Sequence, residues 1–186
     1  MRRSFAAIAL VILTIGAAAG WIYYHTTRYD EMIDQASARN GLDFYLIKAL
    51  VFEESWFRAQ SRGNAGEVGL MQVSMGAATD FCTRKGFPQL YQERLLDPAL
   101  NLEIGCWYLR QSYERYRNTP APELFALLRY NAGQSRADVW LKEALSKPVP
   151  AGIAPERYYL SLVDIPDTRE YARSILQRYR NRQFWF

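Results

Sequence analysis

Residues 43–58 read DFYLIKALVFEESWFR, and this stretch indicates the class of fold. Asp43 is of a type that caps helix N-termini, because its carboxylate can accept hydrogen bonds from the first free backbone N–H groups. Apolar residues then recur at three- and four-residue spacing: Phe44, Ile47, Leu50 and Val51. The spacing predicts a helix from about residue 44 to residue 58, with one face directed into a core.

The same helical spacing recurs along the chain, and no segment shows the alternation of a β-strand. Further helices are predicted over residues 30–40, 76–85, 98–117, 122–130, 134–146 and 167–180. Residues 61–69 are rich in Gly, Asn and Ser and predict a loop, and three prolines in residues 147–157 predict an extended connection. With 49% hydrophobic residues among 186, the chain can bury a core. We therefore expect one mainly α-helical domain.

The N-terminus carries an uncharged apolar run over residues 5–24, preceded by Arg2 and Arg3. This length suits a single transmembrane helix, and the arginines would keep the N-terminus in the cytoplasm. A signal peptide cleaved after the small residues 17–19 is the alternative. The expected division is an anchor or signal in residues 1–28 and a second domain in residues 29–186, outside the cytoplasm.

Composition excludes several classes of function. The net charge of +4 comes without a dense Lys/Arg block, so nucleic acid is not expected as a partner. His25 is the single histidine, which excludes histidine-dependent triads and His-ligated zinc, so neither metal nor cofactor is expected. Cys82 and Cys106 could form a disulfide in an oxidising compartment, or could be two small buried residues.

Two adjacent glutamates, Glu53 and Glu54, interrupt the largely apolar and aromatic run of residues 51–57. A carboxyl group facing a cleft that holds little water has a raised pKa, and the protonated form can act as a general acid on a glycosidic oxygen. The alternative is that one glutamate is solvated and the other pairs with an arginine. Helical spacing places both beside the apolar stripe and does not choose between them.

Five motifs in the rest of the chain bear on that choice. They are E-S-W-F from Glu54, G-x-x-G-L-M-Q-V from Gly66, N-L-x-x-G-x-x-Y-L from Asn101, A-L-L-R-Y-N-A-G from Ala126 and T-R-E-Y from Thr168. In order and spacing they resemble the soluble-type lytic transglycosylases, over about residues 29–177. The resemblance implies a lysozyme-like helical domain with a substrate groove. It also implies cleavage of the β-1,4 bond between N-acetylmuramic acid and N-acetylglucosamine in peptidoglycan.

By position in the motif, the resemblance makes Glu54, directly before Ser55, the catalytic acid and then base. In such enzymes this one carboxyl protonates the leaving oxygen and then takes the proton of the muramyl 6-hydroxyl, which closes a 1,6-anhydro ring. Glu53 stands where the family varies. The resemblance also implies a monomer in the periplasm, held to the inner membrane of a bacterium or released by signal cleavage, with unidentified envelope proteins as partners.

The resemblance implies that the other motifs line the groove. Ser55 would hydrogen-bond near the acid, although a mid-helix serine can equally bond its own backbone. Gly69 would let the backbone approach a sugar, with Met71 beneath it. Tyr130 would point its hydroxyl at the glutamate, whereas Asn101, Gly105 and Tyr108 would serve helix packing and Tyr171 packing or the cleft wall. The residues implied to bind substrate are Ser55, Gly69, Leu70, Met71, Gln72, Tyr130, Asn131 and Asp167.

The chain departs from the family's pattern at several positions. Asp167 stands in place of a common glutamate, and Glu67 replaces a residue that is often small. Two other functions fit the sequence. A lysozyme-type hydrolase would need a second carboxylate to activate water, for which Asp167, Glu67 and Asp80 are the candidates. A catalytically silent glycan-binding module of an envelope complex is the other alternative.

Overall fold

The helix predicted from residue 44 forms, and most of its residues are buried. The computed structural model describes residues 2–182 and 184, and for residues 2–7 and 9 it describes the backbone only. α3 (Phe44–Ser55) begins after Asp43, whose carboxylate accepts the backbone N–H groups of Tyr45 at 2.7 Å and Leu46 at 3.3 Å. It ends earlier than predicted, because Trp56 and Phe57 adopt left-handed backbone conformations with φ of 53° and 56°.

In the part of the chain that the structure describes, every regular element is helical, apart from isolated bridges in one loop. The elements are α1 (Arg2–Thr27), α2 (Asp30–Arg39), α3, α4 (Met75–Lys85), the 3₁₀ helix η1 (Gln92–Leu96), α5 (Pro98–Tyr116), α6 (Pro122–Ala132), α7 (Gln134–Ser146), α8 (Pro155–Ser161) and α9 (Pro166–Asn181). The mainly α-helical prediction is confirmed. η1 and α8 were not predicted, and α8 begins inside the proline-rich segment because a proline fits the first turn of a helix.

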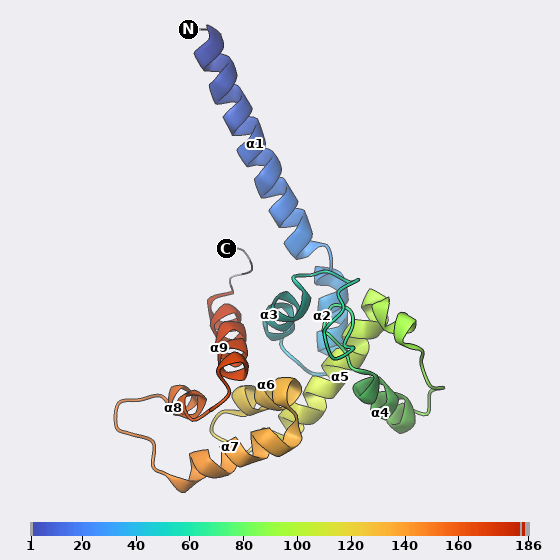
Figure 1. Ribbon diagram of the computed structural model, residues 1–186, viewed down its shortest axis with the longest axis vertical. Helices are drawn as coiled ribbons and strands as arrows, with labels where there is room; N and C mark the ends of the chain where they lie inside the picture. Colours follow the sequence, from blue (N-terminus) through green and yellow to red (C-terminus); the bar gives the residue numbers. More distant parts are fainter. Residues whose placement is uncertain (1, 183, 185–186) are drawn as a thin grey trace.

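α5 is the axis of the helical body (Figure 1). It packs against α2, α4 and α6, and α6 in turn packs against α7 and α9. α9 returns from the C-terminal part of the sequence to lie along α3. Asp97 caps α5, since its carboxylate accepts the backbone N–H of Leu100 at 2.9 Å. The packing of α9 on α3 brings together residues more than 100 positions apart.

The loop between α3 and α4 is held to α5 by one buried amide. The side-chain Nδ2 of Asn101 donates to the carbonyl oxygens of Val68 at 2.8 Å and Leu95 at 2.7 Å, and its Oδ1 accepts the backbone N–H of Met71 at 2.8 Å. Gly69 passes so close that a Cβ atom there would lie 2.2 Å from this Nδ2, and its φ of 85° also favours glycine. Asn101 therefore serves packing, as predicted, and it fixes the loop to the core.

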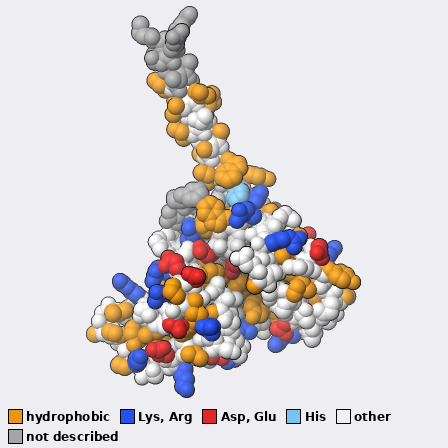
Figure 2. Space-filling model, in the orientation of Figure 1, with side chains coloured by type: hydrophobic (Ala, Val, Ile, Leu, Met, Phe, Trp, Pro, Cys, Tyr) orange, Lys and Arg blue, Asp and Glu red, His pale blue; other side chains and the backbone are white. Residues whose placement is uncertain are grey.

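α1 extends away from the body, and Figure 2 shows apolar side chains along its described part. Ile8, Leu13 and Tyr23 are each more than half exposed, at 57%, 69% and 72%. Residues 5–7 and 9 of the predicted membrane span lie outside the described side chains. Of the residues searched, none belongs to a helix with both the length and the apolar character to cross a bilayer. The transmembrane helix therefore stays a prediction.

The two cysteines do not pair in the structure, so a disulfide between them is not present. Cys82 and Cys106 are both buried and free. The Sγ atom of Cys106 lies 3.9 Å from the sulfur of Met71, and burial raises the pKa of this thiol above its usual range. Both residues act as small apolar side chains of the core.

Candidate active site

Glu54 lies in the last turn of α3, half-buried, with its carboxyl group directed at α9. The hydroxyl of Tyr171 donates to Oε1 of Glu54 at 2.6 Å. Burial raises the pKa of Glu54 from its ordinary value of 4.5 to about 7, and the charges of Glu53 and Glu67 act in the same direction, whereas the Tyr171 hydrogen bond opposes the rise. Near neutral pH, this carboxyl can both give up and accept a proton.

Glu53 has a different environment, although it is the next residue. Its Oε2 accepts a hydrogen bond from the Ser174 hydroxyl at 2.6 Å. Both glutamates thus accept a hydrogen bond from α9, Glu53 from Ser174 and Glu54 from Tyr171. Glu53 accordingly acts on Glu54 as a neighbouring negative charge, and the structure separates two residues that helical spacing could not.

Two tyrosine hydroxyls lie close to the Glu54 carboxyl. Burial, followed by the charge of Glu54, raises the pKa of both Tyr130 and Tyr171 well above 10, so both remain protonated donors. The hydroxyl of Tyr130 was expected to point at Glu54, but in the structure it donates to the carbonyl oxygen of Met71 at 2.8 Å. The residue that bonds to Glu54 is Tyr171, which the sequence had placed only in packing or the cleft wall.

A cleft opens between the α3–α4 loop, the start of α4, α5 and α6. Its lining includes Glu67, Gln72, Ser74, Tyr108 and Tyr130. Gln72 has a left-handed backbone with φ of 45°, and its side-chain Nε2 donates to the carbonyl oxygens of Gly69 at 2.9 Å and Ser61 at 3.3 Å. Gln72 is therefore half-buried and pinned to its own loop, at the wall of the cleft.

Four residues expected to bind substrate instead build the floor beneath the cleft. Leu70 and Met71 have no exposed surface, and Ser55 is only 2% exposed, so their side chains do not reach a ligand. The Ser55 hydroxyl donates to the carbonyl oxygens of Leu70 at 2.8 Å and Val51 at 3.1 Å, which ties α3 to the loop. At Gly69 the missing side chain makes room for Asn101, which is a packing requirement inside the protein.

Asn131 and Asp167 are both exposed at the ends of their helices. Oδ1 of Asn131 accepts a hydrogen bond from the buried Thr168 hydroxyl at 2.7 Å, which fixes the orientation of this amide. Asp167 lies in the first turn of α9, directly before Thr168. Neither is among the residues that line the cleft described above.

The contribution of α9 was the main feature missed from the sequence. Thr168, Tyr171 and Ser174 recur every three residues and contact Asn131, Glu54 and Glu53 in turn. A three-residue spacing of hydroxyl side chains on one helix face was the available signal. It did not reveal which helix they would meet, because that depends on how α9 docks.

Comparisons with known proteins identify the family of the chain. The sequence profile described as "Transglycosylase SLT domain" matches residues 31–149. The chain is 26% identical over 149 residues to the soluble lytic murein transglycosylase of Escherichia coli strain K12, covering 80% of this chain and 22% of that protein. It is 32% identical over 127 residues to the membrane-bound lytic murein transglycosylase C of Glaesserella parasuis, covering 65% and 35%.

Solved structures give the same fold. The lytic transglycosylase Slt of Pseudomonas aeruginosa, solved as an inactive mutant, superposes with a TM-score of 0.71 at 24% identity, over 82% of this chain and 23% of that one. The chain spans between about a fifth and about a third of the length of these relatives. Since the family profile covers well over half of its residues, the chain belongs to the transglycosylase SLT domain family.

Proposed function

We propose that this chain cleaves the β-1,4 bond between N-acetylmuramic acid and N-acetylglucosamine in peptidoglycan without water, leaving a 1,6-anhydromuramyl end. The observation that carries the proposal is the half-buried Glu54 carboxyl, with a pKa of about 7, in the last turn of α3 of an SLT domain. Relatives named as lytic murein transglycosylases support the choice of substrate.

The reaction needs one group that is an acid in its first half and a base in its second. Protonated Glu54 gives its proton to the glycosidic oxygen as the bond from that oxygen to the muramyl C1 breaks. The ionised carboxylate then accepts the proton of the muramyl 6-hydroxyl while that oxygen bonds to C1. Glu54 ends the cycle protonated, and no water is consumed. A nucleophile within the substrate has a high effective concentration and outcompetes solvent.

The neighbouring residues support this cycle in distinct ways. Tyr171 stabilises the ionised form of Glu54 between the two proton transfers, because its hydroxyl donates to the carboxylate. Tyr130 positions the Met71 backbone at the floor. We assign sugar contacts to Gln72 in the wall and to the exposed polar groups of Asn131 and Asp167, with no cofactor taking part.

The test is digestion of purified peptidoglycan by the full chain in mild detergent, with products identified by mass spectrometry. Anhydromuropeptides are expected from the wild type and should be absent with Glu54→Gln. Glu53→Gln is the matched control, since it changes the adjacent glutamate in the same way and should retain the products. Turnover that survives Glu54→Gln but is lost in Glu53→Gln would overturn the assignment.

A lysozyme-type hydrolase is the second candidate, and one observation favours it. Glu67 lines the cleft and its charge acts on Glu54, so it is a second carboxylate near the acid. The other candidates fit less well: Asp80 pairs with Arg84 at 2.8 Å on the surface, and Asp167 is exposed outside this cleft. Reducing ends in the same digestion would show hydrolysis, and no products from folded protein would indicate a binding module.

We further propose that residues 1–28 hold the domain of residues 29–186 at the periplasmic face of a bacterial inner membrane, as a monomer. The exposed apolar side chains of α1 and the membrane-bound relatives support this. Signal cleavage, with release into the periplasm, is the alternative. Membrane flotation of the full chain, followed by sequencing of its mature N-terminus, distinguishes the two.

A further inference from the structure

Two hydrogen-bond acceptors of the cleft wall, Glu67 Oε2 and Gln72 Oε1, lie close together beside Gly63. Nε2 of Gln72 donates to two backbone carbonyl oxygens, which can only accept hydrogen bonds. The orientation of the side-chain amide is therefore fixed, and its Oε1 takes no part in these two bonds. A Cβ atom built on Gly63 would lie 2.7 Å from Glu67 Oε2 and 2.8 Å from this Oε1. The two distances add to 5.5 Å, the largest separation that the two oxygens can have.

The charge on Glu67 is poorly compensated by the protein. Its Oε2 accepts one backbone N–H, from Ala65 at 3.2 Å. Among the described side chains, no Lys or Arg forms an ion pair with it. The charge of Glu67 raises the pKa of Glu54, so it is felt inside the site although the chain as a whole carries +4. This part of the cleft therefore attracts positive charge.

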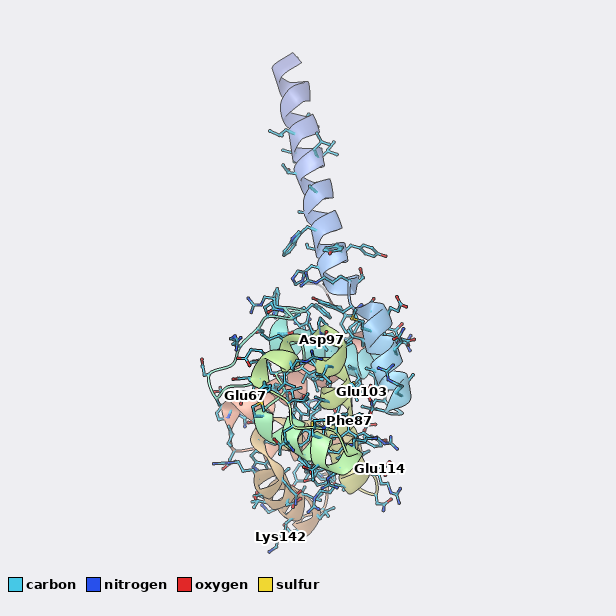
Figure 3. The ribbon with its side chains drawn as sticks, turned by 90° about the vertical axis from the view of Figure 1, so that its right-hand side faces the viewer. Glu67, Phe87, Asp97, Glu103, Glu114 and Lys142 are labelled. Carbon is cyan, nitrogen blue, oxygen red and sulfur yellow. The ribbon has the colours of Figure 1, made fainter. Side chains whose placement is uncertain are left out.

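We propose that Glu67 and Gln72 form a subsite for a protonated primary amine of the substrate. An ammonium group has three donors and no acceptor, which matches two converging acceptors of which one is charged. Donor–acceptor distances of about 2.8 Å to each oxygen would span the gap between them. The N-acetyl form of the same group offers one amide N–H without charge and binds less well. Glu67, labelled in Figure 3, lies in the helical body beneath α1.

The inference rests on the proposed function, because it takes the cleft to hold a peptidoglycan strand. Two parts of such a strand can supply the amine: an amino sugar that has lost its acetyl group, or a diamino acid in the stem peptide. The chemistry recognised is the same for both. In either case Glu67 selects among substrates and does not take part in bond cleavage.

The experiment is isothermal titration of the full chain in detergent at pH 6. The first arm compares glucosamine oligosaccharides with N-acetylglucosamine oligosaccharides of equal length, and the second compares peptide-bearing disaccharides with free and with acetylated side-chain amines. In at least one arm the free amine should bind about five- to tenfold more tightly, as expected for a charged hydrogen bond in a half-open site. Glu67→Gln should abolish this preference.

Glu93→Gln is the matched control, since it removes the same charge from an exposed position on η1 and should keep the preference. Glu67→Ala is the second variant, and circular dichroism checks that each variant is folded. Equal binding of free and acetylated amines by the wild type in both arms would overturn the proposal, as would a preference that survives in both Glu67 variants. Binding is read without turnover, so failure of the cleavage reaction would be seen separately.

Discussion

Replacing Glu54 by glutamine should make the protein more stable at alkaline pH while abolishing the proposed cleavage. In the folded state burial raises the pKa of Glu54 to about 7, whereas the unfolded chain has the ordinary value of 4.5. Between these values the folded state binds more protons than the unfolded state, so the free energy of unfolding falls as pH rises. Below pH 4.5 the Glu54 carboxyl is protonated in both states and does not change the free energy of unfolding. Above pH 7 it is ionised in both states and lowers the free energy of unfolding by the full amount.

The size of the effect follows from the difference in pKa. One pH unit corresponds to about 1.4 kcal/mol, so a rise of about 2.5 units costs about 3 kcal/mol. Glutamine has nearly the same shape, still accepts a hydrogen bond from Tyr171 and carries no charge to desolvate. Glu54→Gln should therefore match the wild type at pH 4 and exceed it by about 3 kcal/mol at pH 8. For a protein of this size that is roughly 6–12 °C in Tm.

The assay is thermal and urea denaturation of wild type and variant in detergent at several pH values between 4 and 8. Glu93→Gln serves as control, because its carboxyl is exposed and the same change should leave the pH dependence of stability unaltered. A stability difference between wild type and Glu54→Gln that stays constant from pH 4 to pH 8 would refute the reasoning. It would show that the Glu54 carboxyl is well solvated.

Three further changes test the surroundings of the acid. Glu53→Gln should move the alkaline limb of the pH–activity profile to lower pH, because a charge that raises the Glu54 pKa is removed. Tyr171→Phe should move that limb to higher pH and lower kcat/KM about tenfold, since a hydrogen bond to the ionised carboxylate is lost; an unchanged profile in either variant would contradict the geometry. Gly69→Ala should destabilise the fold by about 2–4 kcal/mol in urea denaturation, because its Cβ collides with Asn101. Wild-type stability would show that the loop can move.

Much of the helical framework could be predicted from the sequence. Asp43 and Asp97 indicate where α3 and α5 begin, because N-capping is a local interaction between a side chain and the backbone beside it. The end of α3 was predicted three residues late, since Trp56 and Phe57 look compatible with a helix and are turned by packing. The loop residues Leu70 and Met71 were expected in the groove and are core, because burial depends on contacts with α5 and α6 that lie far away in sequence.

The candidate site was also predictable only in part, because some of its contacts are local and others join residues far apart in the sequence. The motif around Glu54 predicts which glutamate is the acid, whereas the hydrogen-bond partner of its carboxyl depends on the register between α3 and α9. That register also decides that Ser174 meets Glu53 and that Thr168 meets Asn131. The acceptor of the Tyr130 hydroxyl likewise depends on the path of the α3–α4 loop. Contacts across such distances in the chain are set by the whole core.

The hydrogen bond between Tyr171 and Glu54 joins residues 117 positions apart. The desolvated acid therefore forms only when α9 docks on α3, after the whole segment between these two helices has been made. Before docking, Glu54 is an ordinary solvated carboxyl that is ionised at neutral pH and has no proton to donate. A chain in which α9 has not yet docked therefore lacks the protonated carboxyl on which the proposed cleavage depends.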